Sequence, residues 1–185
     1  RNLSRAIQYR TISFSEEAIP DSAAFNGFHR FLEETFPRVH ATLGLEKISQ
    51  YSLLYTWQGA NPTQKPIILM SHQDVVPVDQ PTLEDWEAGP FEGRITDTHI
   101  IGRGTMDDKG SLIALMESVE MLLEEGFRPS RTIYLAFGHD EEVGGSNGAA
   151  KIADHLEKKG VEAAMSLDEG GFMAEGVIRG MDARV

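Results

Sequence analysis

Histidine and carboxylate side chains follow three strand-like runs of this sequence. The first run, residues 67–71, is uncharged and ends at His72, with Asp74 two positions later. The other two runs, residues 132–138 and 163–167, are followed within four residues by acidic side chains, namely Asp140, Glu141, Glu142, Asp168 and Glu169. Ligands of open α/β sheets bind at the carboxyl ends of the strands, so we expect these groups to lie together. Imidazole and carboxylate ligands without thiolates suit a hydrolytic zinc, manganese or cobalt centre.

The segment His72-Gln73-Asp74 supplies two parts of such a centre. In extended backbone, residues two positions apart point to the same side. A metal-bound imidazole usually donates its other N–H to a carboxylate, which fixes its tautomer. His72 is therefore the candidate ligand and Asp74 its candidate orienting partner, although a His-x-Asp segment alone is common.

Two acidic pairs extend the pattern. Asp107 and Asp108 open a helix-like segment, where their simplest role is helix capping, and a carboxylate at this turn could also bridge two cations. The glycine spacing around them differs from that of a phosphate-binding loop. Glu141 and Glu142 are adjacent, so in extended backbone one can bind metal while the other accepts a proton from water. A solvated acidic turn is the alternative for this pair, and Asp168 has a similar alternative.

The elements that position these groups alternate along the chain. Strands are predicted at residues 52–57, 67–72, 132–138 and 163–167, and helices at residues 21–36, 112–123 and 149–156. A short helix is predicted within residues 3–14, an irregular loop at residues 75–93, and one arm of a hairpin at residues 94–101. This order predicts βαβ units and therefore an α/β fold with a mostly parallel sheet.

Composition excludes several other kinds of protein. The chain has 185 residues, no cysteine and a net charge of −12, so we expect neither disulfides nor a thiolate metal site. The acidic balance disfavours nucleic acid and anionic membranes as partners, and no apolar span of about 20 residues is present. The chain runs from Arg1 to Val185 and looks trimmed at both ends. A cytoplasmic location is favoured over a vacuolar, secreted or periplasmic one, which would need a targeting segment outside this sequence.

Taken in order, four motifs resemble the co-catalytic zinc exopeptidases, which include aminoacylase, carboxypeptidase S and succinyl-diaminopimelate desuccinylase. The motifs lie at residues 72–74, 102–110, 140–142 and 167–170. Their sequences are most similar to those of the carboxypeptidase S and N-acyl-amino-acid hydrolase branch. The likeness runs from about Leu3 to the last residues. It implies a three-layer α/β fold, in which a mostly parallel sheet is flanked by helices.

The resemblance also implies two bound Zn²⁺ ions, with Co²⁺ or Mn²⁺ as alternatives. His72 and Asp168 would hold one ion and Glu142 the other. Asp107 would bridge the two ions, and its peptide bond to Asp108 is often cis in this family.

Two further residues would have catalytic roles by the same resemblance. Glu141 would be the general base acting on the bridging water, and Asp74 would orient His72. The substrate would be a peptide or an N-acyl amino acid.

Family members carry parts that residues 1–185 do not contain. These are a last metal-binding histidine and an inserted smaller domain for dimerisation and substrate binding, and no other histidine here matches the missing motif: His29, His40, His99, His139 and His155. We therefore expect an incomplete, N-terminal part of a catalytic domain, from a full-length protein that forms a homodimer. A residue needed for turnover would then lie outside this part.

These observations predict a zinc-dependent amide-bond hydrolase, either a carboxypeptidase or an N-acyl-amino-acid hydrolase. One alternative is a deacetylase or desuccinylase acting on a biosynthetic N-acyl amino acid. Another is a non-catalytic metal-binding domain on the same scaffold, which the presence of Glu141 disfavours. A third is an α/β domain whose acidic residues lie on the surface and bind no metal. In that case Asp107→Ala would leave the metal content unchanged.

Overall fold

The structure, a computed structural model, describes residues 1–170. Within them, a five-stranded sheet has the order β1-β2-β6-β3-β7. Its strands are β1 (Gly44–Ile48), β2 (Ser52–Trp57), β3 (Ile67–His72), β6 (Ile133–Gly138) and β7 (Met165–Leu167). Strands β6, β3 and β7 are parallel neighbours, whereas β1 and β2 are antiparallel additions at one edge. The carboxyl ends of the three parallel strands therefore point the same way.

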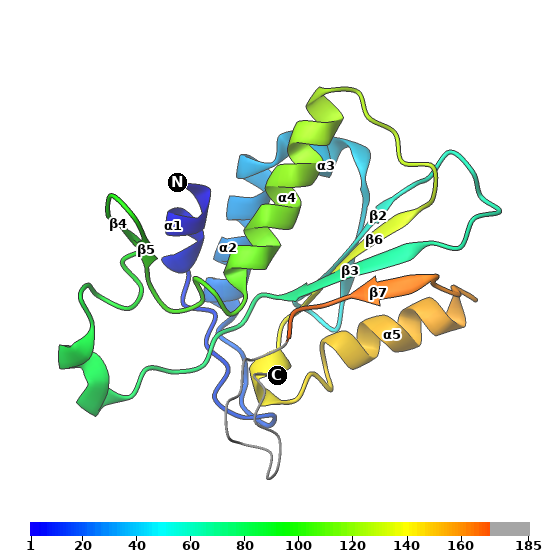
Figure 1. Ribbon diagram of the computed structural model, residues 1–185. Helices are drawn as coiled ribbons and strands as arrows, with labels where there is room; N and C mark the ends of the chain where they lie inside the picture. The colour runs from blue at the N-terminus through cyan, green and yellow to red at the C-terminus, as the bar shows by residue number, and fades with distance from the viewer. Residues whose placement is uncertain (171–185) are drawn as a thin grey trace, which may run out of the picture.

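Helices cover both faces of this sheet (Figure 1). Four helices lie over one face: α1 (Asn2–Ile7), α2 (Ser22–Thr35), α3 (Pro37–Thr42) and α4 (Lys109–Glu124). Helix α5 (Ala149–Lys158) lies over the other face. This arrangement confirms the predicted three-layer α/β fold.

The larger core lies between the sheet and α2 and α4. Helix α2 begins where predicted, because the Asp21 carboxylate accepts hydrogen bonds from the backbone N–H groups of Ala23 and Ala24. Its buried face includes Phe28 and Leu32, and the apolar stripe of α4 packs beside it. The helical periodicity seen in the sequence thus corresponds to the face that each helix buries.

A smaller core lies under α5. Ile152 and Leu156 of this helix pack against Leu54 of β2 and Ala136 of β6. Strand β6 is therefore apolar on both faces, as expected for a strand covered on both sides.

A lobe of irregular structure leaves the sheet between β3 and α4. It contains the 3₁₀ helix η1 (Gln80–Asp85) and a hairpin of β4 (Arg94–Ile95) and β5 (Ile100–Ile101). Residues 94–101 were expected to form one arm of a hairpin, but they contain both arms, each only two residues long. The hydroxyl of Ser4 in α1 donates to the Gly93 carbonyl and ties the lobe to the main body. Across residues 1–170, no helix has the length and apolar character needed to span a membrane.

Candidate metal centre

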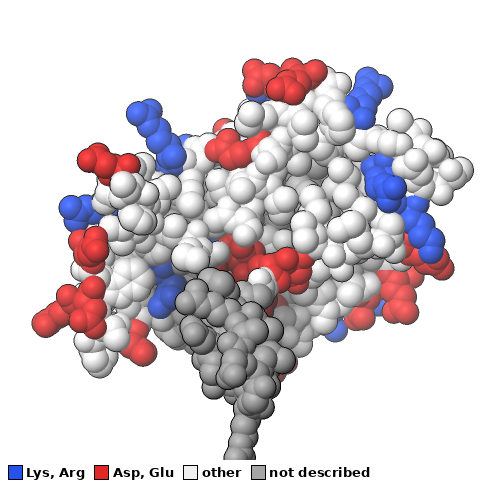
Figure 2. All heavy atoms as spheres, viewed as in Figure 1, with Lys and Arg blue, Asp and Glu red and all other residues white. Residues whose placement is uncertain are grey.

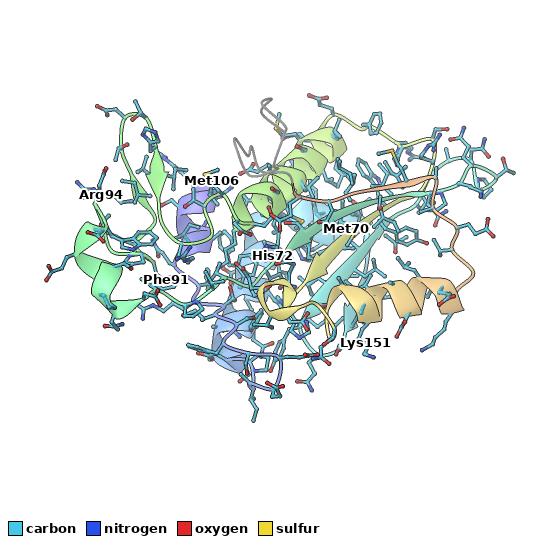
Figure 3. All side chains as sticks on the ribbon, turned by 60° about the horizontal axis from the view of Figure 1, so that its bottom comes forward. Met70, His72, Phe91, Arg94, Met106 and Lys151 are labelled. Carbon is cyan, nitrogen blue, oxygen red and sulfur yellow. The ribbon has the colours of Figure 1, made fainter. Side chains whose placement is uncertain are left out.

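His72 lies at the carboxyl end of β3, near the centre of the molecule (Figure 3). The residue is only 2% exposed. Its Nδ1 lies 3.2 Å from the Asp74 Oδ1 and 3.1 Å from the Asp74 carbonyl oxygen. Because both neighbours are acceptors, Nδ1 carries a proton, and Nε2 is the nitrogen that faces the acidic groups beyond the strand end.

Three carboxylates surround this Nε2. The Asp107 Oδ1 lies 2.8 Å away, the Glu169 Oε1 3.2 Å away and the Glu141 Oε2 3.8 Å away. The ligand atoms of His72, Asp107 and Glu169 all lie within 4.8 Å of one another, a spacing that could hold one metal ion. Acidic side chains also gather at the middle of the face drawn in Figure 2. The strand ends thus bring Glu141 and Glu169 to His72, together with Asp107.

Asp107 and Asp108 have separate surroundings. The peptide bond between them is cis, as the resemblance implied. The Asp107 side chain is exposed and faces His72, whereas Asp108 is fully buried and its Oδ2 accepts hydrogen bonds from the Ser71 hydroxyl and the His72 backbone N–H. Asp108 makes no side-chain cap to α4, so it ties the turn to β3 and leaves Asp107 beside His72.

Glu141 and Glu142 lie in the 3₁₀ helix η2 (Glu141–Val143), so the expectation of extended backbone here was wrong. Their side chains still diverge: Glu141 approaches His72, and the Glu142 Oε1 accepts a hydrogen bond from the Val76 N–H. Their backbone N–H groups donate to the two oxygens of Asp74, at 3.1 and 3.2 Å. Asp74, which is 0% exposed, therefore holds both His72 and the glutamate turn.

The end of β7 presents two adjacent carboxylates. Glu169, which the sequence analysis left without a role, is the one that reaches His72. Asp168 is exposed, and its Oδ1 accepts a hydrogen bond from the backbone N–H of Glu169. Asp168 also lines a small cavity of about 80 Å³ together with His72 and Glu141. A metal-binding role for Asp168 stays a prediction, and Glu169 is a second candidate from the same strand end.

The cluster is charged in a way that favours a bound cation. Burial lowers the pKa of His72, but hydrogen bonds and charges from Asp74, Asp107 and Glu169 outweigh it and raise this pKa to about 10. Burial, with the charge of Asp107, raises the pKa of Glu142 to about 7, and burial also raises the pKa of Glu169. One imidazolium therefore does not neutralise the carboxylates, and a divalent cation would relieve their repulsion.

Lys109 is a buried residue whose role the sequence analysis missed. It is 0% exposed, and its Nζ donates to the carbonyls of Tyr9 at 2.6 Å and Ala6 at 3.3 Å. The Nζ also lies 5.0 Å from the centre of the Phe28 ring. Burial lowers the pKa of Lys109 to about 7. Lys109 links the start of α4, directly after the Asp107 turn, to the C-terminal end of α1.

A groove of about 840 Å³ borders Asp107 and runs into the irregular lobe. Its apolar lining includes Trp86, Ile101 and Met106, and Met106 is 89% exposed. The Arg103 guanidinium carbon lies 5.5 Å from the centre of the Trp86 ring. The candidate metal cluster therefore opens directly onto a groove large enough for a small organic substrate.

Several curated proteins are similar in sequence. The chain is 49% identical to a "Probable carboxypeptidase S-like 2" from Dictyostelium discoideum, over 92% of the chain and 33% of that protein. It is 40% identical to an "N-fatty-acyl-amino acid synthase/hydrolase" from Xenopus tropicalis, over 99% of the chain and 35% of that protein. It is 47% identical to "Carboxypeptidase S" from Saccharomyces cerevisiae, over 82% of the chain and 27% of that protein. The chain thus spans about a third of the length of the curated relatives it matches.

Solved structures share the fold. A metallo-carboxypeptidase from Sulfolobus solfataricus superimposes with a TM-score of 0.68 at 23% identity, over 92% of the chain and 37% of that structure. Human carnosine dipeptidase 1 gives a TM-score of 0.67 at 17% identity, over 92% of the chain and 38% of that structure. The sequence relatives confirm the predicted carboxypeptidase S and N-acyl-amino-acid hydrolase branch. Residues 68–180 match the family described as peptidase family M20/M25/M40, and the chain belongs to that family.

Proposed function

We propose that this chain forms the metal-binding part of an amide-bond hydrolase that acts on peptides or N-acyl amino acids. The observation that carries the proposal is that carboxylate oxygens of Asp107, Glu169 and Glu141 lie within 3.8 Å of the His72 Nε2. The names of the sequence relatives, carboxypeptidase S and N-fatty-acyl-amino acid synthase/hydrolase, support the reaction class. Both names describe proteins that act on a carbonyl group attached to an amino acid nitrogen.

The residues present suit a divalent metal ion. One imidazole nitrogen and several carboxylate oxygens form a nitrogen and oxygen donor set without sulfur, as zinc, cobalt and manganese accept. His72 and Asp107 would hold the ion together with Asp168 or Glu169, and Glu142 would be a ligand of a second ion if two are bound. When bound, such an ion would polarise the scissile carbonyl and make water more acidic.

The protein side chains would then move the protons. Glu141 is half-exposed at the edge of the cluster, so its carboxylate can accept a proton from the attacking water and return it to the leaving amine. Asp74 holds His72 by its Nδ1 side and accepts the N–H groups of Glu141 and Glu142. Asp74 therefore fixes the distance between the ligand and the base.

The groove beside Asp107 would accept the substrate. Its apolar lining, including Trp86 and Met106, suits an apolar side chain or an acyl chain. We propose that the natural protein contains more of the catalytic domain and a dimerisation domain, since the chain spans about a third of its relatives.

The proposal is tested by Glu141→Gln, with Glu84→Gln as the matched control. Glu84 lies exposed in η1, away from the cluster. Hydrolysis of an N-acyl amino acid and of a dipeptide is measured in the full-length protein that contains this chain, together with metal content. We expect Glu141→Gln to lower kcat by roughly 10²–10⁴-fold with an unchanged metal content, because general base catalysis contributes a factor of this size. Equal rates in the two variants would show that Glu141 is not the base.

A further inference from the structure

Gln73 lies between His72 and Asp74 and points the other way. Successive side chains of an extended strand alternate between its two sides, so Gln73 faces the interior when its neighbours face the metal cluster. It is 0% exposed. A buried primary amide must find hydrogen-bond partners for both its nitrogen and its oxygen, because an unpaired buried polar group is costly.

The Gln73 side chain is bonded to three separate segments. Its Nε2 donates to the Tyr51 carbonyl at 2.8 Å and to the Phe137 carbonyl at 2.9 Å. These carbonyls lie just before β2 and near the end of β6. Both amide hydrogens are then used, so the Oε1 is the atom that meets the His29 Nε2 at 2.8 Å. His29 is therefore the donor of this bond, from the middle of α2.

The Gln73 backbone is held as firmly as its side chain. Its N–H donates to the Gly138 carbonyl at 2.9 Å, and its carbonyl accepts the Thr11 hydroxyl at 2.6 Å. The end of β3 is thus fixed from the neighbouring strand, from the N-terminal segment and from α2. A rotation of this segment would move His72 and Asp74 together, because both flank Gln73 in the chain.

The Gln73 amide is the hydrogen-bond partner of the His29 Nε2. It is 8% exposed, and its Nδ1 has no hydrogen-bond partner in residues 1–170. Burial lowers its pKa to about 4, so the ring is neutral near pH 7. A neutral ring carries one N–H, and the bond to Gln73 requires that it be on Nε2.

We propose that Gln73 and His29 are positioning residues, which hold the end of β3 so that His72 and Asp74 keep the geometry of the metal cluster. This inference rests on the proposed function. The pair contacts neither the substrate groove nor the metal ligand atoms, and it acts through the backbone of β3. Neither residue was given a role by the motifs in the sequence.

The test compares His29→Leu with His29→Gln. Leucine removes the donor and leaves the Gln73 Oε1 buried without a partner, whereas the glutamine Nε2 can replace the imidazole Nε2. The control is His40→Leu. His40 also lies on the α2 and α3 side of the sheet and bonds to Phe36 and Tyr55, but it has no bond to the end of β3.

Two quantities are measured in the purified protein. The first is the affinity for Co²⁺, with its visible absorption spectrum as a reporter of ligand geometry. We expect His29→Leu to weaken Co²⁺ binding by about 10-fold or more, as changes to groups that orient metal ligands commonly do. His29→Gln should remain within about 3-fold of the unchanged protein, and His40→Leu should lower thermal stability without changing the spectrum.

The second quantity is amide hydrogen exchange in the metal-free protein. The Glu141 and Glu142 N–H groups donate to Asp74, so they should exchange faster in His29→Leu than in His40→Leu. Equal Co²⁺ affinity and equal exchange in these two variants would overturn the positioning role. If the unchanged protein bound no Co²⁺, the proposed metal function would fail, and the exchange rates alone would then decide the role of His29.

Discussion

Replacing Gly110 by alanine tests whether the start of α4 is built around the metal-ligand turn. A Cβ added at Gly110 would lie 2.3 Å from the carbonyl oxygen of Thr105, two residues before Asp107. Real Cβ atoms essentially never approach an atom within 3.0 Å, so either the turn or the helix must shift. The obstructing atom belongs to the backbone and cannot rotate away as a flexible side chain would.

Two effects of opposite sign decide how much Gly110→Ala changes the free energy of unfolding. Alanine favours a helix over glycine by up to about 1 kcal/mol. Overpacking a closely packed site costs about 1–3 kcal/mol, and the shift needed here is about 0.7 Å in a turn that is also bonded through Asp108 to β3. We therefore expect the free energy of unfolding to fall by roughly 1–2 kcal/mol. The Asp107 carboxylate should also move away from His72.

The assay is urea unfolding of the metal-free protein, followed by metal affinity measured well below the unfolding transition. Gly44→Ala is the matched control, because the nearest atom to its added Cβ lies 3.9 Å away. We expect this control to bind metal normally, and Gly110→Ala to bind it more weakly. A Gly110→Ala protein as stable as the unchanged one, with the same metal affinity, would refute the reasoning.

Three further predictions concern the cluster itself. In the metal-free protein the pKa of His72 is raised from 6.5 to about 10, so the stabilising effect of its imidazolium is present below pH 6.5 and is lost as the pH rises towards 10. Metal binding near pH 8 should therefore release a proton from His72, which calorimetry in buffers of different ionisation enthalpy measures. A binding reaction that releases no proton would contradict the raised pKa. Asp74→Asn should weaken metal binding by about 10–100-fold, because it removes the orienting carboxylate; an unchanged affinity in a chelator competition would count against that role. Asp168→Asn and Glu169→Gln should differ in metal affinity, with the larger loss identifying the ligand from β7, and no loss in either would exclude both.

The sheet and its main helices could be predicted because their sequence patterns match simple physical requirements. The uncharged run before His72 became β3, and the stripe around Leu112 became the buried face of α4. The parallel order followed from alternation of strands and helices along the chain. The convergence of His72 and Asp107 was predictable for the same reason, since both lie at carboxyl ends or turns on one edge of the sheet.

Other features depend on contacts between distant segments. Strand β1 was not predicted, because most of its residues are charged or exposed at the sheet edge and its apolar residues do not alternate with polar ones. Sequence alone could not decide between Asp168 and Glu169, because the direction of each side chain depends on where β7 ends. The burial of Lys109 and the bond between His29 and Gln73 were also missed, since each joins residues that lie more than 40 positions apart.

Glycine roles illustrate the same limit. Of Gly102, Gly104 and Gly110, only Gly104 has a positive φ, of 85°. Gly102 and Gly110 are needed because a Cβ would collide with Ile7 and with the Thr105 carbonyl.

The most direct test of the account is the metal content of the purified protein and of Asp107→Ala, measured by elemental analysis after exposure to zinc and removal of loosely bound ions. Asp97→Ala, an exposed change in the β4–β5 hairpin, is the control. The account predicts one or two zinc ions per chain in the unchanged protein and the control, and a clear loss in Asp107→Ala. Equal zinc content in all three proteins, or none in any of them, would contradict the assignment of this cluster as a metal centre.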